Sequence, residues 1–282
     1  MTEVGSMVEK IKILDTTLRD GEQAAGLVFS LEEKMLIACL LDKLPIDEIE
    51  VGMPIMGKME QEIIREIRGQ VNKPLLTWNR GLEQDVEASL ECGIARVHLS
   101  LPVSDLHLEY KLRKSREWVL RQLDKVVRFA INEGCEVSVG AEDATRADLE
   151  FLKEFILVAQ RAGAFRLRVA DTVGVLDPFR SYHLIKGLKE GLDIELEIHA
   201  HNDFGMAAAN AYGAIKGGAQ WVSTTINGIG ERAGNVNYSQ LNQVGVEWYG
   251  WEQSEEHKQV MKQLSQVVLA AMYRIPKCTV YI

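Results

Sequence analysis

The feature that most constrains the fold is a regular alternation of short apolar runs with longer amphipathic stretches. The short runs have the length of buried strands, and the stretches between them space their apolar residues as helices do. This alternation predicts a parallel sheet, because each helix returns the chain to the same edge of the sheet. The predicted strands are Ile11–Leu14, Glu48–Val51, Pro74–Trp78, Arg96–Leu101, Glu136–Ala141, Arg166–Ala170, Glu195–His199 and Trp221–Thr225.

The number of strand units favours a closed barrel. Eight units within 282 residues fit an α/β fold of the (β/α)8 TIM-barrel type better than a doubly wound sheet. Ser30 with Glu33 forms a capping box at the first helix start. We assign residues 1–250 to a catalytic barrel and residues 251–282 to a C-terminal helical extension. The predicted helices are Leu31–Leu44, Met59–Arg68, Leu82–Glu91, Ser115–Asn132, Ala147–Ala162, Pro178–Glu190 and Gly205–Lys216, with a short turn or helix over the barrel mouth at Ser104–Lys111.

Composition narrows the class of function. A formal net charge of -9 argues against a nucleic-acid surface and favours a small-molecule site. The four cysteines show no CxxC spacing, which is typical of reduced thiols. The sequence begins without the pattern of a signal peptide, and no apolar run reaches the length of a membrane span. We therefore expect a cytoplasmic enzyme with no nucleic-acid or membrane partner.

Polar residues follow the predicted strands where a barrel of this type places its chemistry. Arg19 and Asp20 follow the first strand, and His199 and His201 end the seventh. The two histidines are two residues apart, so both imidazoles point to the same side of the strand. Two imidazoles and a carboxylate suit a divalent metal, and Asn235 could add an oxygen ligand. A cation beside a metal stabilises a developing negative oxygen, which favours a catalytic role for Arg19.

Other titratable residues at the barrel mouth are less specific signals. Glu142 is the best candidate for a general base, the alternative being a solvated loop carboxylate. His98 lies within the fourth strand and either faces the lumen, where it would contact substrate, or is a hydrogen-bonded core histidine. His107, His183 and His257 are predicted to be surface or supporting residues.

Three long motifs, in order, resemble those of one enzyme family. They are Leu18–Gln23, Glu197–Gly205 and Asn227–Asn235, and the similarity extends from about Lys12 to Glu247. The chain resembles the alpha-isopropylmalate synthase and homocitrate synthase family of metal-dependent barrel enzymes. Two further segments, Leu99–Asp105 and Val137–Asp148, look like the nitrogenase-associated homocitrate synthases of that family.

The resemblance implies a Claisen-type condensation of acetyl-CoA with a 2-oxo acid, 2-oxoglutarate being favoured, to give homocitrate and CoA. The cofactor implied is a divalent cation, which could be Mg, Mn, Zn or Fe. The implied roles are metal binding by Asp20, His199, His201 and Asn235, substrate binding by Arg19, Gln23, His98 and Thr172, and catalysis by Arg19 and Glu142.

Two departures from the family bear on substrate and activity. Lysine-pathway homocitrate synthases have an arginine and a serine where this chain has Ser138 and Gly140, and that arginine grips the distal carboxylate. Arg80 and Arg19 are the nearest substitutes. Full-length relatives also continue into a region with a His-Glu-Ala-Gly-Ile-His segment, which this chain lacks. We therefore expect a truncated chain or the catalytic half of a split enzyme.

Such a chain is expected to bind metal and 2-oxo acid but to turn over poorly alone, as a homodimer or as partner of a C-terminal-half subunit. Its apolar end, Cys278–Ile282, fits that expectation. The alternatives are an isopropylmalate or citramalate synthase acting on another 2-oxo acid, a related carbon–carbon lyase, or a poorly active ligand-binding subunit.

Overall fold

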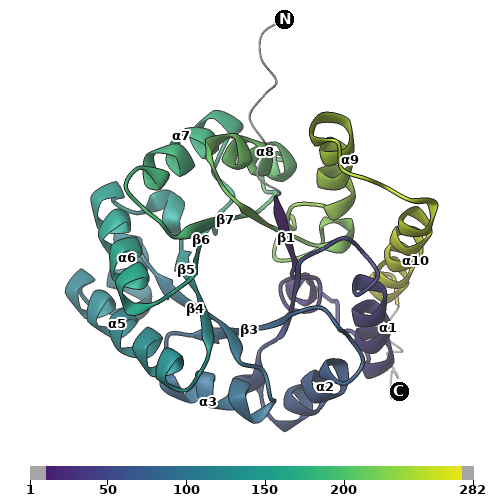
Figure 1. Cartoon of the computed structure of the whole chain (residues 1–282), viewed down its shortest axis with the longest axis horizontal. Coiled ribbons are helices and arrows are strands. Elements are labelled where there is room, and N and C mark those ends of the chain that lie inside the picture. Colours follow the sequence, from purple (N-terminus) through teal and green to yellow (C-terminus); the bar gives the residue numbers. More distant parts are fainter. Residues whose placement is uncertain (1–10, 275–282) are drawn as a thin grey trace, which may run out of the picture.

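The computed structural model describes residues 11–274, which form a closed barrel of parallel strands surrounded by helices (Figure 1). The strands follow one another in chain order, and β1 pairs with β8 to close the barrel. The predicted (β/α)8 TIM barrel is therefore confirmed. The strands are β1 (Lys12–Asp15), β2 (Glu48–Gly52), β3 (Leu75–Arg80), β4 (Arg96–Pro102), β5 (Glu136–Glu142), β6 (Arg166–Asp171), β7 (Glu195–Ala200) and β8 (Trp221–Thr224).

The helices lie outside the strands and bury their apolar faces against them (Figure 1). The long helices are α1 (Leu31–Leu41), α2 (Lys58–Arg68), α3 (Glu83–Glu91), α5 (Arg116–Asn132), α6 (Leu149–Ala162), α7 (Pro178–Lys189), α8 (Ala207–Gly217), α9 (Tyr238–Tyr249) and α10 (Glu255–Met272). Short helical turns are η1 (Gly21–Gln23), η2 (Pro54–Met56), α4 (Asp105–His107), the π-helical η3 (Leu108–Leu112), η4 (Ala144–Arg146) and η5 (Ile226–Gly228).

Local signals account for most helix starts and for the differences from prediction. The Ser30 and Glu33 capping box is present at α1, but that helix ends at Leu41, three residues before the predicted Leu44. The predicted turn over the mouth is confirmed as α4 and η3. Helix α9 was not predicted, although Asn237 caps it by accepting from the Ser239 amide.

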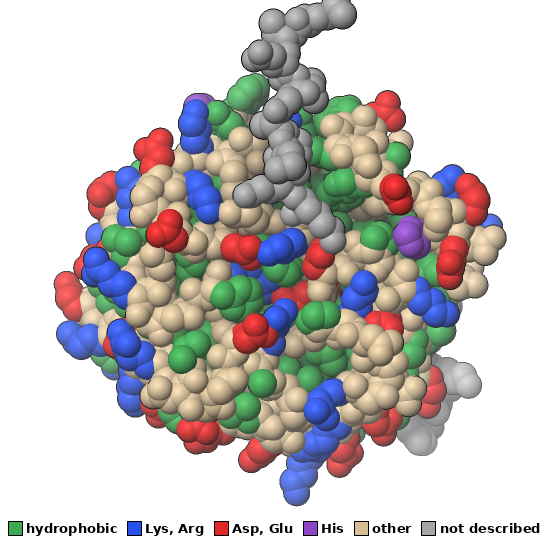
Figure 2. Space-filling view, in the orientation of Figure 1, with side chains coloured by type: hydrophobic (Ala, Val, Ile, Leu, Met, Phe, Trp, Pro, Cys, Tyr) green, Lys and Arg blue, Asp and Glu red, His purple; other side chains and the backbone are tan. Residues whose placement is uncertain are grey.

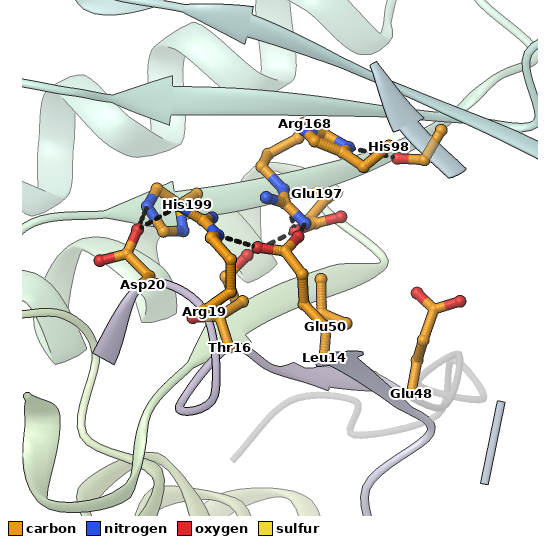
Figure 3. Close-up of polar contacts among 12 residues, drawn as sticks. Leu14, Thr16, Arg19, Asp20, Glu48, Glu50, His98, Arg168, Glu197 and His199 are labelled. Carbon is orange, nitrogen blue, oxygen red and sulfur yellow. Dashed lines mark hydrogen bonds and ion pairs between the residues drawn. The ribbon is translucent and has the colours of Figure 1, made fainter. Parts of the chain in front are cut away.

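The barrel interior contains charged side chains that the sequence analysis did not predict. Glu50 on β2, Arg168 on β6 and Glu197 on β7 are fully or almost fully buried. Arg168 donates from Nε to Glu197 Oε1 at 2.6 Å and from Nη2 to Glu50 Oε2 at 2.7 Å. Below this layer, Arg166 donates from Nη2 to Glu48 Oε2 at 2.6 Å. The predicted strands Glu48–Val51 and Arg166–Ala170 therefore place charged side chains inside the barrel, where glutamates and arginines form ion pairs (Figure 3).

One helix contact depends on a glycine. A Cβ at Gly213 of α8 would lie 2.2 Å from the backbone oxygen of Pro178 at the start of α7, whereas one at Gly187 of α7 would meet nothing within 4 Å. We expect Gly213→Ala to destabilise the fold by about 1–3 kcal/mol through overpacking. Gly187→Ala, the matched control, should instead stabilise it by about 0.5–1 kcal/mol. Urea unfolding of both variants checks these opposite signs, and equal midpoints would contradict them.

Within residues 11–274 no helix is both long and apolar enough to cross a membrane. Figure 2 shows acidic and basic side chains interspersed over one face of the molecule. Cys39, Cys92 and Cys135 are free thiols, as predicted, while Cys278 and the rest of the predicted apolar end lie outside the described residues. Helix α10 packs against α1, and its Ser265 donates to Asn227 of η5 at 2.7 Å.

Candidate metal centre and substrate cavity

A cavity of about 460 Å³ opens at the carboxyl ends of the strands. It is lined by residues of β3, β4, β5, β6 and β7 and of the loops that follow β1, β4, β6, β7 and β8. A second cavity, of about 400 Å³, lies at the opposite end near the first residues of β3 and β4. The first cavity is lined by Arg19, Asp20, Gln23, Trp78, His98, Ser100, His107, Lys111, Gly140, Glu142, Arg168, Ala170, Thr172, Val173, His199, His201, Glu231 and Arg232.

The predicted carboxylate and histidines meet in this cavity. Ligand atoms of Asp20, His199 and His201 lie within 4.8 Å of one another, and all three side chains are buried. No other group of this kind occurs among the described residues. Nε2 of His199 lies 3.2 Å from Asp20 Oδ2, and Nδ1 of both histidines is buried without a hydrogen-bond partner in residues 11–274. Two buried imidazoles beside a buried carboxylate, with ligand atoms this close together, fit a divalent cation.

Electrostatics keep two of these groups in their metal-binding forms. Burial opposes ionisation of Asp20, but Arg19, with Nη1 3.0 Å from Oδ2, and the two histidines hold the pKa of that carboxyl well below its usual range. Burial, together with neighbouring His199, lowers the pKa of His201 to about 4. At neutral pH the carboxylate is therefore ionised and this imidazole is neutral, as metal ligands must be.

Asn235 lies against the same carboxylate. Its Nδ2 donates to Asp20 Oδ1 at 2.7 Å and to the Ile229 backbone oxygen at 3.1 Å. Gly230, at φ 147°, leaves the room for this, since a Cβ there would lie 2.0 Å from Nδ2. In this orientation Asn235 positions Asp20, and its Oδ1, which is buried without a hydrogen-bond partner in residues 11–274, is left for the predicted role as an oxygen ligand.

Arg19 is held between two acidic residues (Figure 3). Its Nε donates to Glu50, and its Nη1 faces Asp20 and donates to Gln23 Oε1 at 3.5 Å. The guanidinium carbon also lies 5.7 Å from the centre of the Trp78 ring. The side chain is only 9% exposed, so its cationic group is fixed in direction toward the cavity.

Glu142 ends β5 at the rim of the cavity. Its Oε1 accepts from Lys111 Nζ at 2.6 Å and lies 3.2 Å from His107 Nδ1. Lys111 was not singled out in the sequence, and His107 was assigned only a surface or supporting role. Both residues lie in the predicted turn over the barrel mouth, and that turn is the feature of the sequence that could have indicated their contact with Glu142.

Thr172, after β6, also lines the cavity, and its hydroxyl oxygen accepts a hydrogen bond from the Asp143 amide at 2.8 Å.

His98 faces the barrel lumen and is also hydrogen-bonded there, so the two predicted placements coincide, while contact with substrate stays a prediction. It lines the cavity, and its Nδ1 lies 3.0 Å from Ser138 Oγ. Burial and the nearby arginines hold its pKa well below the usual range, so the ring is neutral.

Arg80 is excluded as a substitute for the arginine that lysine-pathway homocitrate synthases have at the position of Ser138. Its Nε and Nη2 each donate to Asp85 at 2.9 Å, and it does not line the cavity.

Arg232 was part of a matched motif but received no role from the sequence. It donates to both carboxylate oxygens of Asp203 at 2.8 Å and to the Thr172 backbone oxygen at 2.8 Å. It thereby ties together the loops that follow β6, β7 and β8. This places Thr172 firmly at the cavity wall.

The fold and this site define a (β/α)8 barrel protein with a candidate divalent-metal centre at the carboxyl ends of its strands. The HMGL-like family model matches residues 10–268, so the chain belongs to the HMGL-like family. The HMG-CoA lyase of Bacillus subtilis shares the fold, with a TM-score of 0.82, 16% sequence identity and coverage of 94% of each chain.

Curated relatives are more similar in sequence. The chain is 53% identical to 2-isopropylmalate synthase 2 of Caldanaerobacter subterraneus over 227 residues, which are 80% of the chain and 59% of the relative. It is 46% identical to homocitrate synthase 1 of a Nostoc species, over 94% of the chain and 70% of the relative. It is 43% identical to homocitrate synthase subunit alpha of Clostridium pasteurianum, over 85% of the chain and 90% of the relative. The chain thus spans less than two thirds of the first relative's length.

Proposed function

We propose that the chain condenses acetyl-CoA with a 2-oxo acid, 2-oxoglutarate being favoured, and releases homocitrate and CoA, slowly when it acts alone. The observation that carries the proposal is the convergence of Asp20, His199 and His201 in one buried centre beside the fixed cation of Arg19. The names of the curated relatives, homocitrate and 2-isopropylmalate synthases, support the same class of reaction.

Asp20, His199 and His201 would hold the cation, with Asn235 beside them. When bound, a divalent metal supplies a Lewis acid that polarises a ketone carbonyl. The ligand set does not distinguish Mg, Mn, Zn or Fe. Arg19 directs its guanidinium at the same point and stabilises negative charge on the ketone oxygen during attack, because Glu50 and Asp20 prevent it from turning away.

Proton transfer is assigned to Glu142. Its carboxylate takes a proton from the methyl group of the acetyl thioester, and the resulting carbanion forms a bond to the ketone carbon of the 2-oxo acid. Glu142 then returns the proton to the former ketone oxygen, which becomes the hydroxyl group of the product. Thr172 and Gln23 bind the carboxylate next to that ketone. Water then cleaves the thioester, which releases the CoA thiol and makes the reaction irreversible.

Glu142→Gln is expected to separate catalysis from binding. The amide keeps the size of the side chain but cannot take a proton, so the rate of CoA release should fall by about 100-fold or more. The metal-dependent dissociation constant of 2-oxoglutarate should stay within about twofold, because Glu142 is not among the metal-binding residues. Free-thiol kinetics and calorimetry measure the two effects. A wild-type rate in the variant would remove Glu142 as the base.

A substrate panel tests the proposed function. CoA release is measured with 2-oxoglutarate, 2-oxoisovalerate and pyruvate, with each divalent metal and after chelation. Preference for 2-oxoglutarate supports the proposal, and release independent of any 2-oxo acid contradicts it. A second candidate is a synthase acting on 2-oxoisovalerate, which the 53% identity to a 2-isopropylmalate synthase and the absence of an arginine at Ser138 favour. The same panel distinguishes the two.

A further inference from the structure

Ser138 occupies the position where an arginine would be expected to bind a distal carboxylate. The hydrogen bonds of its hydroxyl group indicate a different role. Its Oγ is fully buried in the barrel interior on β5. It accepts from Arg166 Nε at 3.2 Å and lies 3.0 Å from His98 Nδ1. These are the only partners of its hydroxyl among the described residues.

The direction of the second hydrogen bond follows from the first. A guanidinium can only donate, so Arg166 uses one acceptor site of the hydroxyl and leaves its hydrogen free. If His98 Nδ1 also donated to Ser138, that hydrogen would be buried with no acceptor. Ser138 therefore donates to Nδ1, and the single proton of the neutral imidazole must be on Nε2.

Nε2 faces the substrate cavity because Gly140 leaves room for it. A Cβ at position 140 would lie 2.5 Å from this nitrogen. No residue in 11–274 forms a hydrogen bond with Nε2, and both His98 and Gly140 line the cavity. Arg168 lines the cavity too and lies beside His98 (Figure 3).

We propose that Ser138 is a positioning residue that fixes the His98 tautomer, so that Nε2–H donates to the second carboxylate of a dicarboxylic 2-oxo acid. This inference rests on the proposed function and names the group that selects its substrate. A branched or short 2-oxo acid has no second carboxylate to accept this hydrogen bond, so the same donor does not strengthen its binding.

The tautomer can be read without turnover. The chain has six histidines, so long-range proton–nitrogen NMR of ¹⁵N-labelled protein resolves them, with His98→Gln assigning the signal of interest. We expect His98 to carry its proton on Nε2 in the native chain and to populate both tautomers in Ser138→Ala. A proton on Nδ1 in the native chain, or an unchanged tautomer in Ser138→Ala, overturns the inference.

Binding constants test the consequence for substrate choice. With Mg²⁺ present, Ser138→Ala should raise the dissociation constant of 2-oxoglutarate about tenfold, the effect of one weakened hydrogen bond to a charged group, and leave that of 2-oxoisovalerate unchanged. Ser138→Thr keeps the hydroxyl and should restore both tautomer and affinity. Gly140→Ala should weaken 2-oxoglutarate binding while keeping the tautomer.

Equal weakening of both acids in Ser138→Ala overturns the inference. Absence of CoA release would refute the proposed condensation but leave the tautomer and binding results readable, so the two failures are distinguishable.

Discussion

Replacing His201 by alanine is expected to abolish the metal-dependent binding of a 2-oxo acid. His201 is buried, its pKa of about 4 keeps it neutral, and its Nδ1 has no partner in the described chain. Removing one of three ligands should weaken divalent-metal binding by about 100-fold or more, since even outer-shell changes cost 10–100-fold. Calorimetric titration with Mn²⁺, and thermal stabilisation by 2-oxoglutarate with Mn²⁺ present, measure the loss.

A matched control is His183→Ala, which removes an exposed histidine of α7 and should leave both readouts unchanged. The native protein should lose its stabilisation by 2-oxoglutarate on chelation, whereas the His201→Ala variant should show none to lose. Equal stabilisation of the two proteins would exclude the assigned metal centre.

Replacing Arg168 by methionine is expected to give the largest loss of stability. Arg168 is 2% exposed and joins Glu50 to Glu197 inside the barrel. Both carboxylates would keep a single arginine partner, Arg19 for Glu50 and Arg166 for Glu197, and so would be buried with incomplete compensation. Removing one partner of such a buried cluster costs about 3–5 kcal/mol of unfolding free energy. Urea unfolding monitored by circular dichroism measures this change.

The control for that substitution is Arg128→Met on α5. Arg128 donates to Asp124 at 2.9 Å, but both side chains are about half exposed, at 54% and 43%. An ion pair of this kind contributes about 0–1 kcal/mol, so the midpoint should hardly move. Equal effects of the two substitutions would show that the barrel charges are not coupled as described.

The fold was predictable because every unit of the barrel repeats the same local pattern. The helices have caps and amphipathic faces, and the strands are short apolar runs, so each element is recognisable from its own residues. Elements that pack together in the barrel are also neighbours in the chain, so their order follows from the sequence. Helix α9 escaped prediction because its small and polar residues, such as Ser239 and Gly245, weaken the helical pattern.

The interior charges were harder to predict for a physical reason. Glu48 and Glu50, or Arg166 and Arg168, alternate along a strand as residues on a solvent-facing side would. Only closure of the barrel brings charges from β2, β6 and β7 into contact and pairs them. His199 on β7 and His201 directly after it were predictable as a pair, because their spacing puts both imidazoles on one side of the extended chain.

The roles of individual site residues depend on orientations that a sequence does not contain. Asn235 turns its amide nitrogen toward Asp20, which no motif indicates. Likewise, the partners of Glu142 come from a turn inserted after β4, whose path over the mouth is a tertiary feature.

We expect this cavity to join the methyl carbon of the acetyl group to the ketone carbon of a 2-oxo acid. Mass spectrometry and ¹³C NMR of the products from acetyl-CoA labelled at the methyl carbon, with 2-oxoglutarate and Mg²⁺ or Mn²⁺, test it directly. We expect one labelled homocitrate for each CoA released, and neither product in the His201→Ala variant. CoA release accompanied by labelled acetate and no new carbon–carbon bond would contradict it.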